Sequence, residues 1–569
     1  MNDLSRYILA IVLAMIILFS WQIFFPVEQS VYNQEEDTID MSIEEIEISN
    51  INKALATAKS SCTSEKVIID NNRIEGSIDL CGAQINEIFL KKFNTSTDLD
   101  SDYVQLFKEE SYWVESGWLA PRGANFILPD ENTLWKLESQ NSILSPDTPI
   151  IISWNNGNGL NFIKKFSIDE NYLFTFTQEV ENGTSGLITL FPFNKLSRQE
   201  LPTSQTLGLL HEGPTGWFDE ELDEQDYDDI SKKDYRKEFR NGWIGVRDKY
   251  WATAISSLDE GEKKAHFKVS RQNKSDIYRI GYTGEASSAS PGGTISSSGL
   301  IFIGAKEVDI IQNYSENKNL PKFDLIIDWG WFYFISKPLF YILDFLYIYT
   351  GNFGMAILLL TVLIKLVFFP VVNRSYVQMA KMRKVQPEIQ KMKDLYGDDR
   401  QKMAQEMQTL YKKEELKPLS GCLPIFIQIP VFFALYNVLL VTIEMRHAPF
   451  FGWIRDLSAP DPLSVFNLFG IINWTPPQIL MIGFFHLLFG LTFFLQTKLN
   501  PAPTDQIQKT LFTWMPIFMI FIAANFPIGL VIYWAWNGLL SIIQQAYIMK
   551  KQGMEIALFA NFGKKNSEE

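Results

Sequence analysis

The chain has 569 residues, of which 46% are apolar and 14% aromatic, and its formal net charge is −15. Residues 26–330 carry 50 Asp and Glu against 29 Lys and Arg, whereas the rest of the chain has a net charge of +6. This length allows two or more domains, and the acidic balance argues against nucleic-acid recognition by the large region. The numbers favour an acidic extramembrane domain joined to a mildly basic membrane part.

The first hydrophobic segment covers residues 7–25 and is followed by Pro26. A membrane-spanning helix needs about 17–25 such residues. A cleaved signal peptide is the alternative, but residues 20–30 (SWQIFFPVEQS) contain no small-residue cleavage site and no cysteine for lipid attachment. We therefore expect residues 1–25 to form an N-terminal transmembrane anchor and the acidic residues 26–50 to form a linker.

Residues 51–328 consist of short alternating runs separated by Gly, Asn, Asp and Pro, as in 173–179 (LFTFTQE) and 276–282 (DIYRIGY). Alternation with a period of two predicts strands. Many short strands with turn residues between them are typical of a two-sheet β-sandwich. We expect this sandwich to be an exported domain.

Two of the three cysteines, Cys62 and Cys81, lie in this region. A two-residue hairpin loop at Asn71 and Asn72 would place them opposite each other, with Cα atoms roughly 5.5 Å apart. That separation allows a disulfide, which is stable in an exported domain. Two free cysteines in adjacent strands are the alternative.

Residues 329–350 (WGWFYFISKPLFYILDFLYIYT) are aromatic and amphipathic, and Lys337, Pro338 and Asp344 interrupt them. This composition predicts a helix that lies along the membrane interface. A seventh membrane span is the competing interpretation. The distribution of positive charge described below disfavours it.

Lys365 lies well inside the hydrophobic run of residues 353–372. A cation at that depth costs at least roughly 2.5–3.5 kcal/mol, and no strongly hydrophobic segment contains an acidic residue to neutralise it. Thr361 lies one helical turn earlier on the same face. Two polar groups on one stripe favour a hydrophilic groove that anionic groups can enter. The alternative is that Lys365 extends towards the polar flank at Asn373, about 12 Å away.

The remaining spans follow in order along the chain, and we predict a membrane-spanning core over residues 351–549. The predicted spans are 353–372, 423–441, 479–495, 511–526 and 528–549. Loop 373–420 carries 11 Lys and Arg, and Lys550 and Lys551 follow the last span, whereas loop 442–477 contains only Arg446 and Arg455. Positive charge gathers on the cytoplasmic side, so we expect both termini and the tail 550–569 to be cytoplasmic, and the sandwich to be periplasmic.

Loop 373–420 is helical in pattern, with a turn at Gly397, Asp398 and Asp399. Apolar residues recur at steps of three and four on both sides of that turn, which predicts an antiparallel helical hairpin. Methionines dominate its apolar face, and they adapt to varied partners. The methionines that we expect to contact varied apolar peptides are Met379, Met382, Met392, Met403 and Met407. The alternative is that they only pack the two helices together.

No motif for catalysis or metal binding is present: the four histidines have no ligand spacing, and HExxH, GxSxG and phosphate-loop sequences are missing. A serine–lysine dyad with Lys365 would need a serine at the same depth, and Ser541 is the one candidate. Several other polar residues in the spans, among them Gln428 and Tyr533, are explained by interhelical hydrogen bonds or by a shared hydrophilic cavity. We expect no enzyme, no metal and no cofactor.

Several stretches in order resemble the YidC/Oxa/Alb family of membrane protein insertases. They are 328–365, 379–390 (MAKMRKVQPEIQ), 421–430 (GCLPIFIQIP), 448–458 (APFFGWIRDLS) and 526–533 (FPIGLVIY). The exported domain resembles that of the family's Gram-negative members, notably at 242–254 and 303–306. The resemblance covers nearly the whole chain.

The resemblance implies a multi-domain membrane protein of the bacterial inner membrane, with an all-α transmembrane core of five helices, an N-terminal anchor helix and a β-sandwich periplasmic domain. It also implies a hydrophilic groove in which Lys365 replaces the usual arginine. Thr361 matches a groove residue, Tyr533 matches the first residue of an aromatic pair, and Trp534 stands where the second is a tyrosine. Residues 467–477 are an addition relative to the best-known members.

The implied function is insertion and folding of inner-membrane proteins without nucleotide hydrolysis. The implied partners are nascent membrane proteins, ribosome–nascent chain complexes, the Sec translocon and the lipid bilayer. Two rival hypotheses are a small-solute transporter, which would favour internal repeats that are not visible, and a membrane protein whose exported sandwich senses a ligand.

Overall fold

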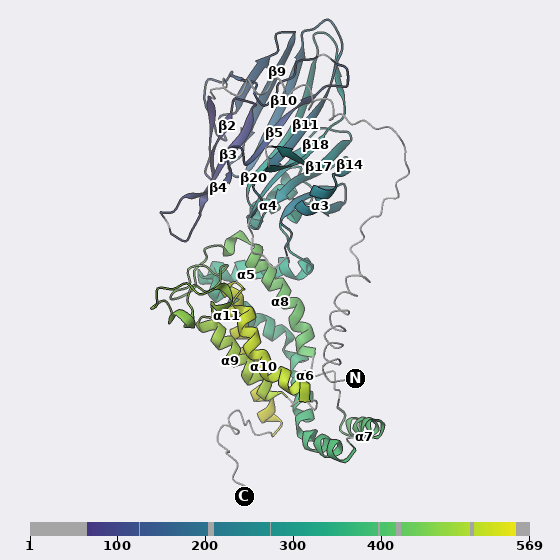
Figure 1. Ribbon diagram of the computed structural model, residues 1–569, viewed down its shortest axis with the longest axis vertical. Helices are drawn as coiled ribbons and strands as arrows, with labels where there is room; N and C mark the ends of the chain where they lie inside the picture. The colour runs from purple at the N-terminus through teal and green to yellow at the C-terminus, as the bar shows by residue number, and fades with distance from the viewer. Residues whose placement is uncertain are drawn as a thin grey trace. The chain divides into compact units, whose positions relative to one another are not determined.

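The computed structural model describes residues 65–553, apart from 99, 125, 203–209, 273–274, 397–398, 417–422 and 501–505. The predicted N-terminal anchor, the linker, Cys62 and most of the tail lie outside the described residues. The described part contains a β-sandwich, followed along the chain by a helical part (Figure 1).

Two sheets form the sandwich, and their strand pairs are antiparallel except for the short pair β1–β7. In the first sheet the order is β14 (Tyr235–Phe239), β17 (Lys263–Gln272), β18 (Ser275–Thr283), β11 (Ile188–Arg198), β5 (Tyr112–Leu119), β3 (Gln84–Asn94), β2 (Ile74–Asp79), β1 (Lys66–Asp70) and β7 (Ile143–Leu144), with β19 (Ser287–Ala289) beside β11 and β4 (Tyr103–Phe107) beside β3. In the second sheet it is β13 (Glu221–Glu224), β12 (Gly213–Phe218), β15 (Gly242–Arg247), β16 (Trp251–Ser257), β20 (Thr294–Ala305), β10 (Leu173–Asn182), β9 (Leu160–Ile168), β8 (Ile150–Asn155) and β6 (Lys136–Leu137).

The alternating sequence pattern forms this sandwich because every second side chain of a strand points to the same face. In β9 the buried positions alternate with more exposed ones along the whole strand. The inward side chains include Phe162, Phe174 and Phe176, each no more than 1% exposed. Three short helical elements accompany the strands: α3 (Tyr227–Lys232), α4 (Val308–Asn317) and η1 (Phe323–Ile326). The predicted β-sandwich is confirmed.

The first hairpin differs from its predicted register by two residues. β1 and β2 pair Lys66 with Asp79 and Asp70 with Glu75, so the two loop residues are Asn72 and Arg73. The reason is the side chain of Asn71, whose Oδ1 accepts hydrogen bonds from the backbone N–H groups of Arg73 and Ile74 at 2.8 and 2.7 Å. An Asn that bonds the backbone two residues on starts the turn after itself.

This register removes the argument that placed Cys62 opposite Cys81. Cys81 itself is disulfide-bonded, but Cys62 lies outside the described residues. Their pairing stays a prediction.

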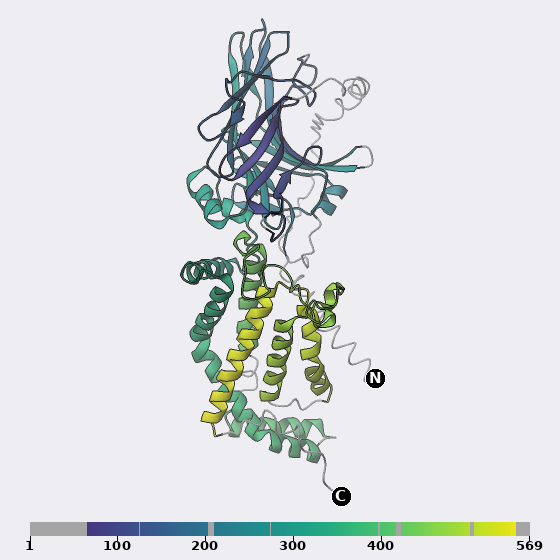
Figure 2. The ribbon, with the colours of Figure 1, turned by 90° about the vertical axis from the view of Figure 1, so that its left-hand side faces the viewer.

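The helical part contains seven α-helices and three short 3-10 turns among the described residues. They are α5 (Tyr333–Thr350), α6 (Phe353–Tyr396), α7 (Arg400–Lys413), α8 (Leu423–Val441), η3 (Ile443–Met445), η4 (Val465–Asn467), η5 (Gln478–Leu480), α9 (Phe484–Leu499), α10 (Gln506–Ala523) and α11 (Ile528–Lys551). Figure 2 shows α9, α10 and α11 side by side, and contacts join α11 to both α6 and α9. Among the described residues, α6 alone is long and apolar enough to cross a membrane by length and composition, and α8, α9 and α10 contain shorter apolar stretches.

Two helix boundaries differ from the predicted spans. α9 begins at Phe484 and not at 479, because residues 478–480 form a 3-10 turn and Gly483 is extended, with φ −94° and ψ −168°. α10 covers Gln506–Ala523, shifted towards the N-terminus from the predicted 511–526. α5 lies within the predicted interfacial segment and ends at Gly351, whose φ of 63° is left-handed and therefore favours glycine.

Candidate functional site: a lysine between two apolar helices

Lys365 lies on α6 and contacts α11. Its Nζ is 2.6 Å from the hydroxyl Oγ of Ser541, a residue 176 positions later in the chain. Ser541 is only 5% exposed, and no ion pair joins Lys365 to any residue that the structure describes. The ammonium of Lys365 is thus held by a neutral hydroxyl and not by a carboxylate.

The direction of the hydrogen bonds decides what this pair can do. Ser541 Oγ also lies 2.8 Å from the backbone carbonyl of Asn537, to which it donates its proton. The hydroxyl therefore accepts from the Lys365 ammonium. A serine nucleophile needs the opposite arrangement, in which its proton points at a neutral base, so this geometry supports a held cation and not a catalytic dyad.

Thr361 is buried, with 1% of its surface exposed. Its Oγ1 donates to the carbonyl of Ile357 at 2.7 Å, within its own helix. Such back-bonding satisfies the hydroxyl donor locally. The side chain shares the face of Lys365 but is covered by its neighbours, so any contribution to a groove comes through its oxygen lone pairs.

Gln428 and Tyr533 are brought together from α8 and α11. The side-chain amide of Gln428 donates to the hydroxyl of Tyr533, whose ring is 1% exposed. Tyr533, Asn537 and Ser541 follow one another at steps of four along α11, so they share one face. The sequence had already singled out Ser541 as the serine at the depth of Lys365, and the structure places the two side chains in contact.

Trp534 does not join this polar stripe. Its ring stacks on Phe432 and Phe489, with centroids 5.2 and 5.1 Å away, and meets Phe526 edge-on at 5.3 Å. Trp534 therefore packs among aromatic rings, and its place in the hydrophilic groove stays a prediction. Successive residues of a helix point in directions about 100° apart. Trp534 therefore points away from the direction of Tyr533, towards the aromatic side chains of α8 and α9.

The predicted helical hairpin is formed by the end of α6 and by α7. Val385, Ile389, Leu410 and Leu416 make its buried centre, and Met392 packs against them. Met379 is 9% exposed and packs with Ile548 of α11. The other three predicted methionines, Met382, Met403 and Met407, are half-buried. Met392 and Met379 therefore pack within the protein, and contact of the hairpin methionines with other molecules stays a prediction.

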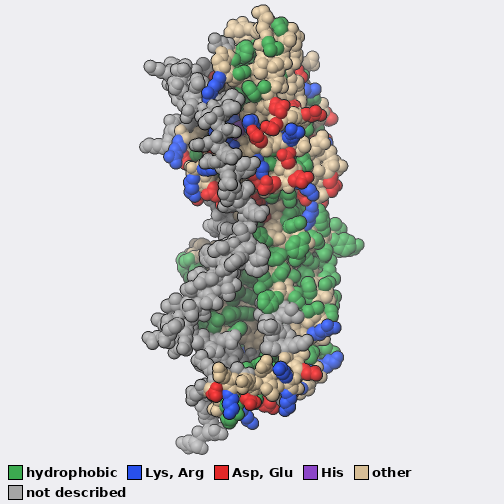
Figure 3. Space-filling model, turned by 90° about the vertical axis from the view of Figure 1, so that its right-hand side faces the viewer, with side chains coloured by type: hydrophobic (Ala, Val, Ile, Leu, Met, Phe, Trp, Pro, Cys, Tyr) green, Lys and Arg blue, Asp and Glu red, His purple; other side chains and the backbone are tan. Residues whose placement is uncertain are grey.

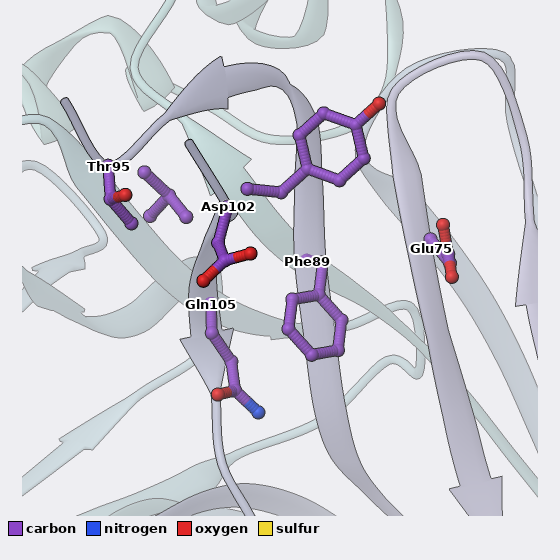
Figure 4. A pocket seen from close by; sticks show the side chains of 7 residues that line it. Glu75, Phe89, Thr95, Asp102 and Gln105 are labelled. Carbon is purple, nitrogen blue, oxygen red and sulfur yellow. The ribbon is translucent and has the colours of Figure 1, made fainter. Parts of the chain in front are cut away.

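A hollow of about 590 Å³ lies in the sandwich, away from the residues described above. Figure 4 shows its lining, to which Glu75, Phe89 and Gln105 contribute from β2, β3 and β4. Among the described residues, no group of three His, Cys, Asp or Glu side chains could hold a metal ion. The side chains that line the hollow therefore do not indicate a particular chemical function.

Figure 3 shows hydrophobic side chains gathered over one section of a face of the helical part. On α6 the exposed side chains include Leu366 and Val367, at 62% and 71%. On α10 they include Trp514 and Phe518, at 63% and 65%. Exposed apolar surface on this scale marks contact with lipid or with other proteins.

Comparison with known proteins accounts for both parts of the chain. Residues 66–342 match the YidC periplasmic domain, and residues 345–555 match the family described as 60Kd inner membrane protein. The membrane protein insertase YidC of Nitrobacter hamburgensis is 41% identical over 608 aligned positions, which cover 100% of this chain and 99% of that protein. The chain belongs to the YidC family of membrane protein insertases. A YidC from Rickettsia bellii is 39% identical and covers 96% of this chain and 99% of its own.

Family membership agrees with the resemblance found in the sequence. A crystal structure of an active YidC insertase with its first transmembrane domain resolved aligns at 18% identity, over 84% of this chain and 91% of that one. Its TM-score is 0.35, which is too low to compare individual positions. The site of this YidC family member therefore rests on its own geometry.

Proposed function

We propose that this chain inserts hydrophobic segments of other proteins into the bacterial inner membrane, and that Lys365 receives acidic groups of the client on the way. The observation that carries the proposal is the ammonium of Lys365, set between apolar helices and bonded to the Ser541 hydroxyl at 2.6 Å. A cation held by a neutral partner keeps its charge available for an anion that arrives later.

The cation of Lys365 and the lipid contribute to insertion in different ways. Bringing a client carboxylate into the membrane is costly, and an opposite charge within about 4–6 Å favours its ionised form. Burial of the client's apolar segment then drives release into lipid, at about 25 cal/mol for each Å² removed from water. No nucleotide hydrolysis is needed, because the final state is lower in free energy than the starting one.

We also propose how the chain is oriented in the membrane and which partners deliver its clients. Both termini face the cytoplasm and the sandwich faces the periplasm, because Lys and Arg gather in the loops assigned to the cytoplasmic side. Nascent membrane proteins are the clients, delivered by ribosome–nascent chain complexes, alone or with the Sec translocon. The hairpin of α6 and α7 contacts the nascent chains first. They then reach the polar side chains of Gln428, Tyr533 and Ser541.

Site-specific crosslinking tests the proposal directly. A photoreactive amino acid at position 362, which lies three residues before Lys365 in α6, should form adducts with a stalled, single-span nascent chain. The same probe at Asn158, in a loop of the sandwich, serves as the control and should form none. Equal labelling from both positions, or none from 362 at any chain length, would contradict the proposal.

A further inference from the structure

Residues 463–482, which we call the apolar loop, lead into α9 and present large hydrophobic side chains to the outside. The exposed fractions are 44% for Phe466, 54% for Leu468, 46% for Phe469, 83% for Ile471, 47% for Ile472, 48% for Trp474 and 54% for Ile479. No Asp, Glu, Lys or Arg occurs between residues 462 and 497. A water-exposed loop normally carries polar residues, so this surface requires a partner.

The loop is held in this shape by its own polar groups. Asn467 is 7% exposed, and its Oδ1 accepts hydrogen bonds from the N–H groups of Gly470 and Ser464 at 3.0 and 3.3 Å. Its Nδ2 donates to the carbonyl of Trp474 at 3.3 Å, and Ser464 Oγ donates to the carbonyl of Leu480 at 2.5 Å. The internal hydrogen bonds fix the backbone while the apolar side chains point away from it.

Two residues of the loop take backbone conformations that bulky side chains avoid. The φ angles of Leu468 and Phe469 are 49° and 55°, in the left-handed region. Each such residue costs roughly 1–2 kcal/mol. A strained turn that exposes a leucine and a phenylalanine is stable only if those side chains are covered where the protein works.

Continuity with α9 and α10 identifies what covers them. The side chain of Gln478 donates to the carbonyl of Ala524 at 3.3 Å, so the loop caps the end of the α9–α10 pair (Figure 2). Beyond the loop, the exposed apolar surface continues on α9 with Phe484 and Leu487, at 49% and 43%. The surface that would face lipid on α9 thus extends into the loop without a charged residue between them.

The length of α9 supports the same conclusion. Its 16 residues span about 24 Å at about 1.5 Å per residue, which is less than the roughly 30 Å of a bilayer core. An apolar loop at its N-terminal end adds hydrophobic height where the helix is short. The backbone hydrogen bonds within the loop meet the condition for irregular chain near lipid, which offers none.

We propose that the apolar loop is embedded in the periplasmic leaflet, with its Phe, Ile, Leu and Trp side chains at the boundary between lipid headgroups and acyl chains. There it anchors the outer ends of α9 and α10 and compensates for their short apolar length. The proposal rests on α9 crossing the membrane and does not depend on the insertion of clients.

Fluorescence quenching tests this placement in the full chain with Cys422→Ser, labelled through Ile471→Cys with a small environment-sensitive dye. In proteoliposomes of phosphatidylethanolamine and phosphatidylglycerol, nitroxide lipids should quench the dye at a depth of about 5–10 Å below the headgroups. Iodide in the buffer should quench it several-fold less than a dye at Asn158→Cys, the exposed sandwich control. Leu487→Cys on α9 provides the lipid-facing reference.

Two outcomes would overturn the proposal. Free access of iodide at position 471 would show that the loop lies in water. Protection from both iodide and nitroxide lipid would show that protein covers it, and loss of that protection on dilution of the protein in lipid would identify a second copy. Because Ile471 is 83% exposed, its replacement leaves the packing of the fold intact, and Asn473→Cys in the same loop repeats the measurement.

Discussion

The buried arginines Arg198 and Arg247 of the sandwich and Lys365 of the helical part have different kinds of partner. In the sandwich, Arg198 lies 2.7 Å from Asp248, and Arg247 is paired with Glu224, so each buried guanidinium has a carboxylate. In the helical part, Lys365 has a hydroxyl as its partner. A charge that is already neutralised stabilises its own fold, whereas one held by a neutral group remains able to attract an anion from outside.

Reversing the charge of Lys365 should have the largest effect on function. Lys365→Glu should reduce insertion of clients with acidic periplasmic tails by at least about tenfold, because each 1.4 kcal/mol of lost attraction is a factor of ten. Lys365→Arg should retain insertion, since the charge remains. Protease protection of a radiolabelled client in proteoliposomes measures both.

Lys498→Glu, an exposed position at the end of α9, makes the same charge change away from the site. It should leave insertion within twofold of the unchanged protein, roughly 0.4 kcal/mol. If the Lys365→Glu protein and the unchanged protein insert clients equally well, the charge of Lys365 is not needed for insertion.

Breaking a pair in the sandwich should instead act on stability. Asp248→Asn leaves Arg198 buried without its carboxylate, which costs about 3–5 kcal/mol. Faster hydrogen–deuterium exchange in peptides from β11 and β15 would report the loss. Insertion by the helical part should fall much less than stability does.

The control for that change is an exposed pair of the same sandwich. Lys264 and Glu238 lie 2.9 Å apart, with side chains 70% and 60% exposed. Glu238→Gln should cost no more than about 1 kcal/mol. If both substitutions change exchange equally, burial does not distinguish the pairs.

Within the helical part, the hairpin of α6 and α7 can be compared with the segment of α6 near Lys365. Removal of residues 396–405 should leave the transmembrane helices folded, because lipid and mutual packing hold them. Insertion should fall a few-fold, and crosslinks from a growing nascent chain should reach Met382 and Met407 before they reach α6 near Lys365. Unchanged insertion rates would show that these methionines only pack the hairpin.

The smallest effect concerns Lys164, a buried lysine of the sandwich without a carboxylate in contact. Its Nζ donates to the carbonyl of Ser116 at 2.6 Å and lies 4.9 Å from the ring of Trp135. Burial lowers the pKa of Lys164 from 10.5 to about 8. Between these two values the unfolded chain holds a proton that the folded chain has lost, so the stability of the sandwich should rise with pH.

Lys164→Met should flatten that rise by on the order of 1–2 kcal/mol between pH 8 and 10.5, since one pKa unit is worth about 1.4 kcal/mol. Lys136→Met, at a side chain 75% exposed, should leave it unchanged. Denaturation at several pH values measures both slopes. A rise that persists in Lys164→Met would assign the effect to another group.

The sequence alone predicted the class of each part because hydrophobic period and length are local properties. Alternating runs predicted the sandwich, and long apolar runs predicted the helical core. The register of the first hairpin could not be predicted from residue counting, because the Asn71 side chain moves the turn by one position. The start of α9 was missed because the apolar residues 479–482 look helical in composition but form the end of the apolar loop.

The candidate site was predictable in part. The depth of Lys365 in its apolar run identified it without any partner. The contact with Ser541 joins residues far apart in the chain, so only the packing of α6 on α11 could show it. Trp534 was assigned by resemblance to the family's aromatic pair; its ring contacts with Phe432 and Phe489 could not be predicted from the sequence because they join different helices.

One helix, α6, carries both the lysine and the first arm of the hairpin. Its 44 residues make a rod of about 66 Å at about 1.5 Å per residue. Pro370 lies inside it, five residues after Lys365, and a proline within a helix removes one backbone hydrogen bond and permits bending. Pro387 lies further along the same helix. The lysine and the first arm of the hairpin therefore belong to one continuous helix with two places between its ends where it can bend.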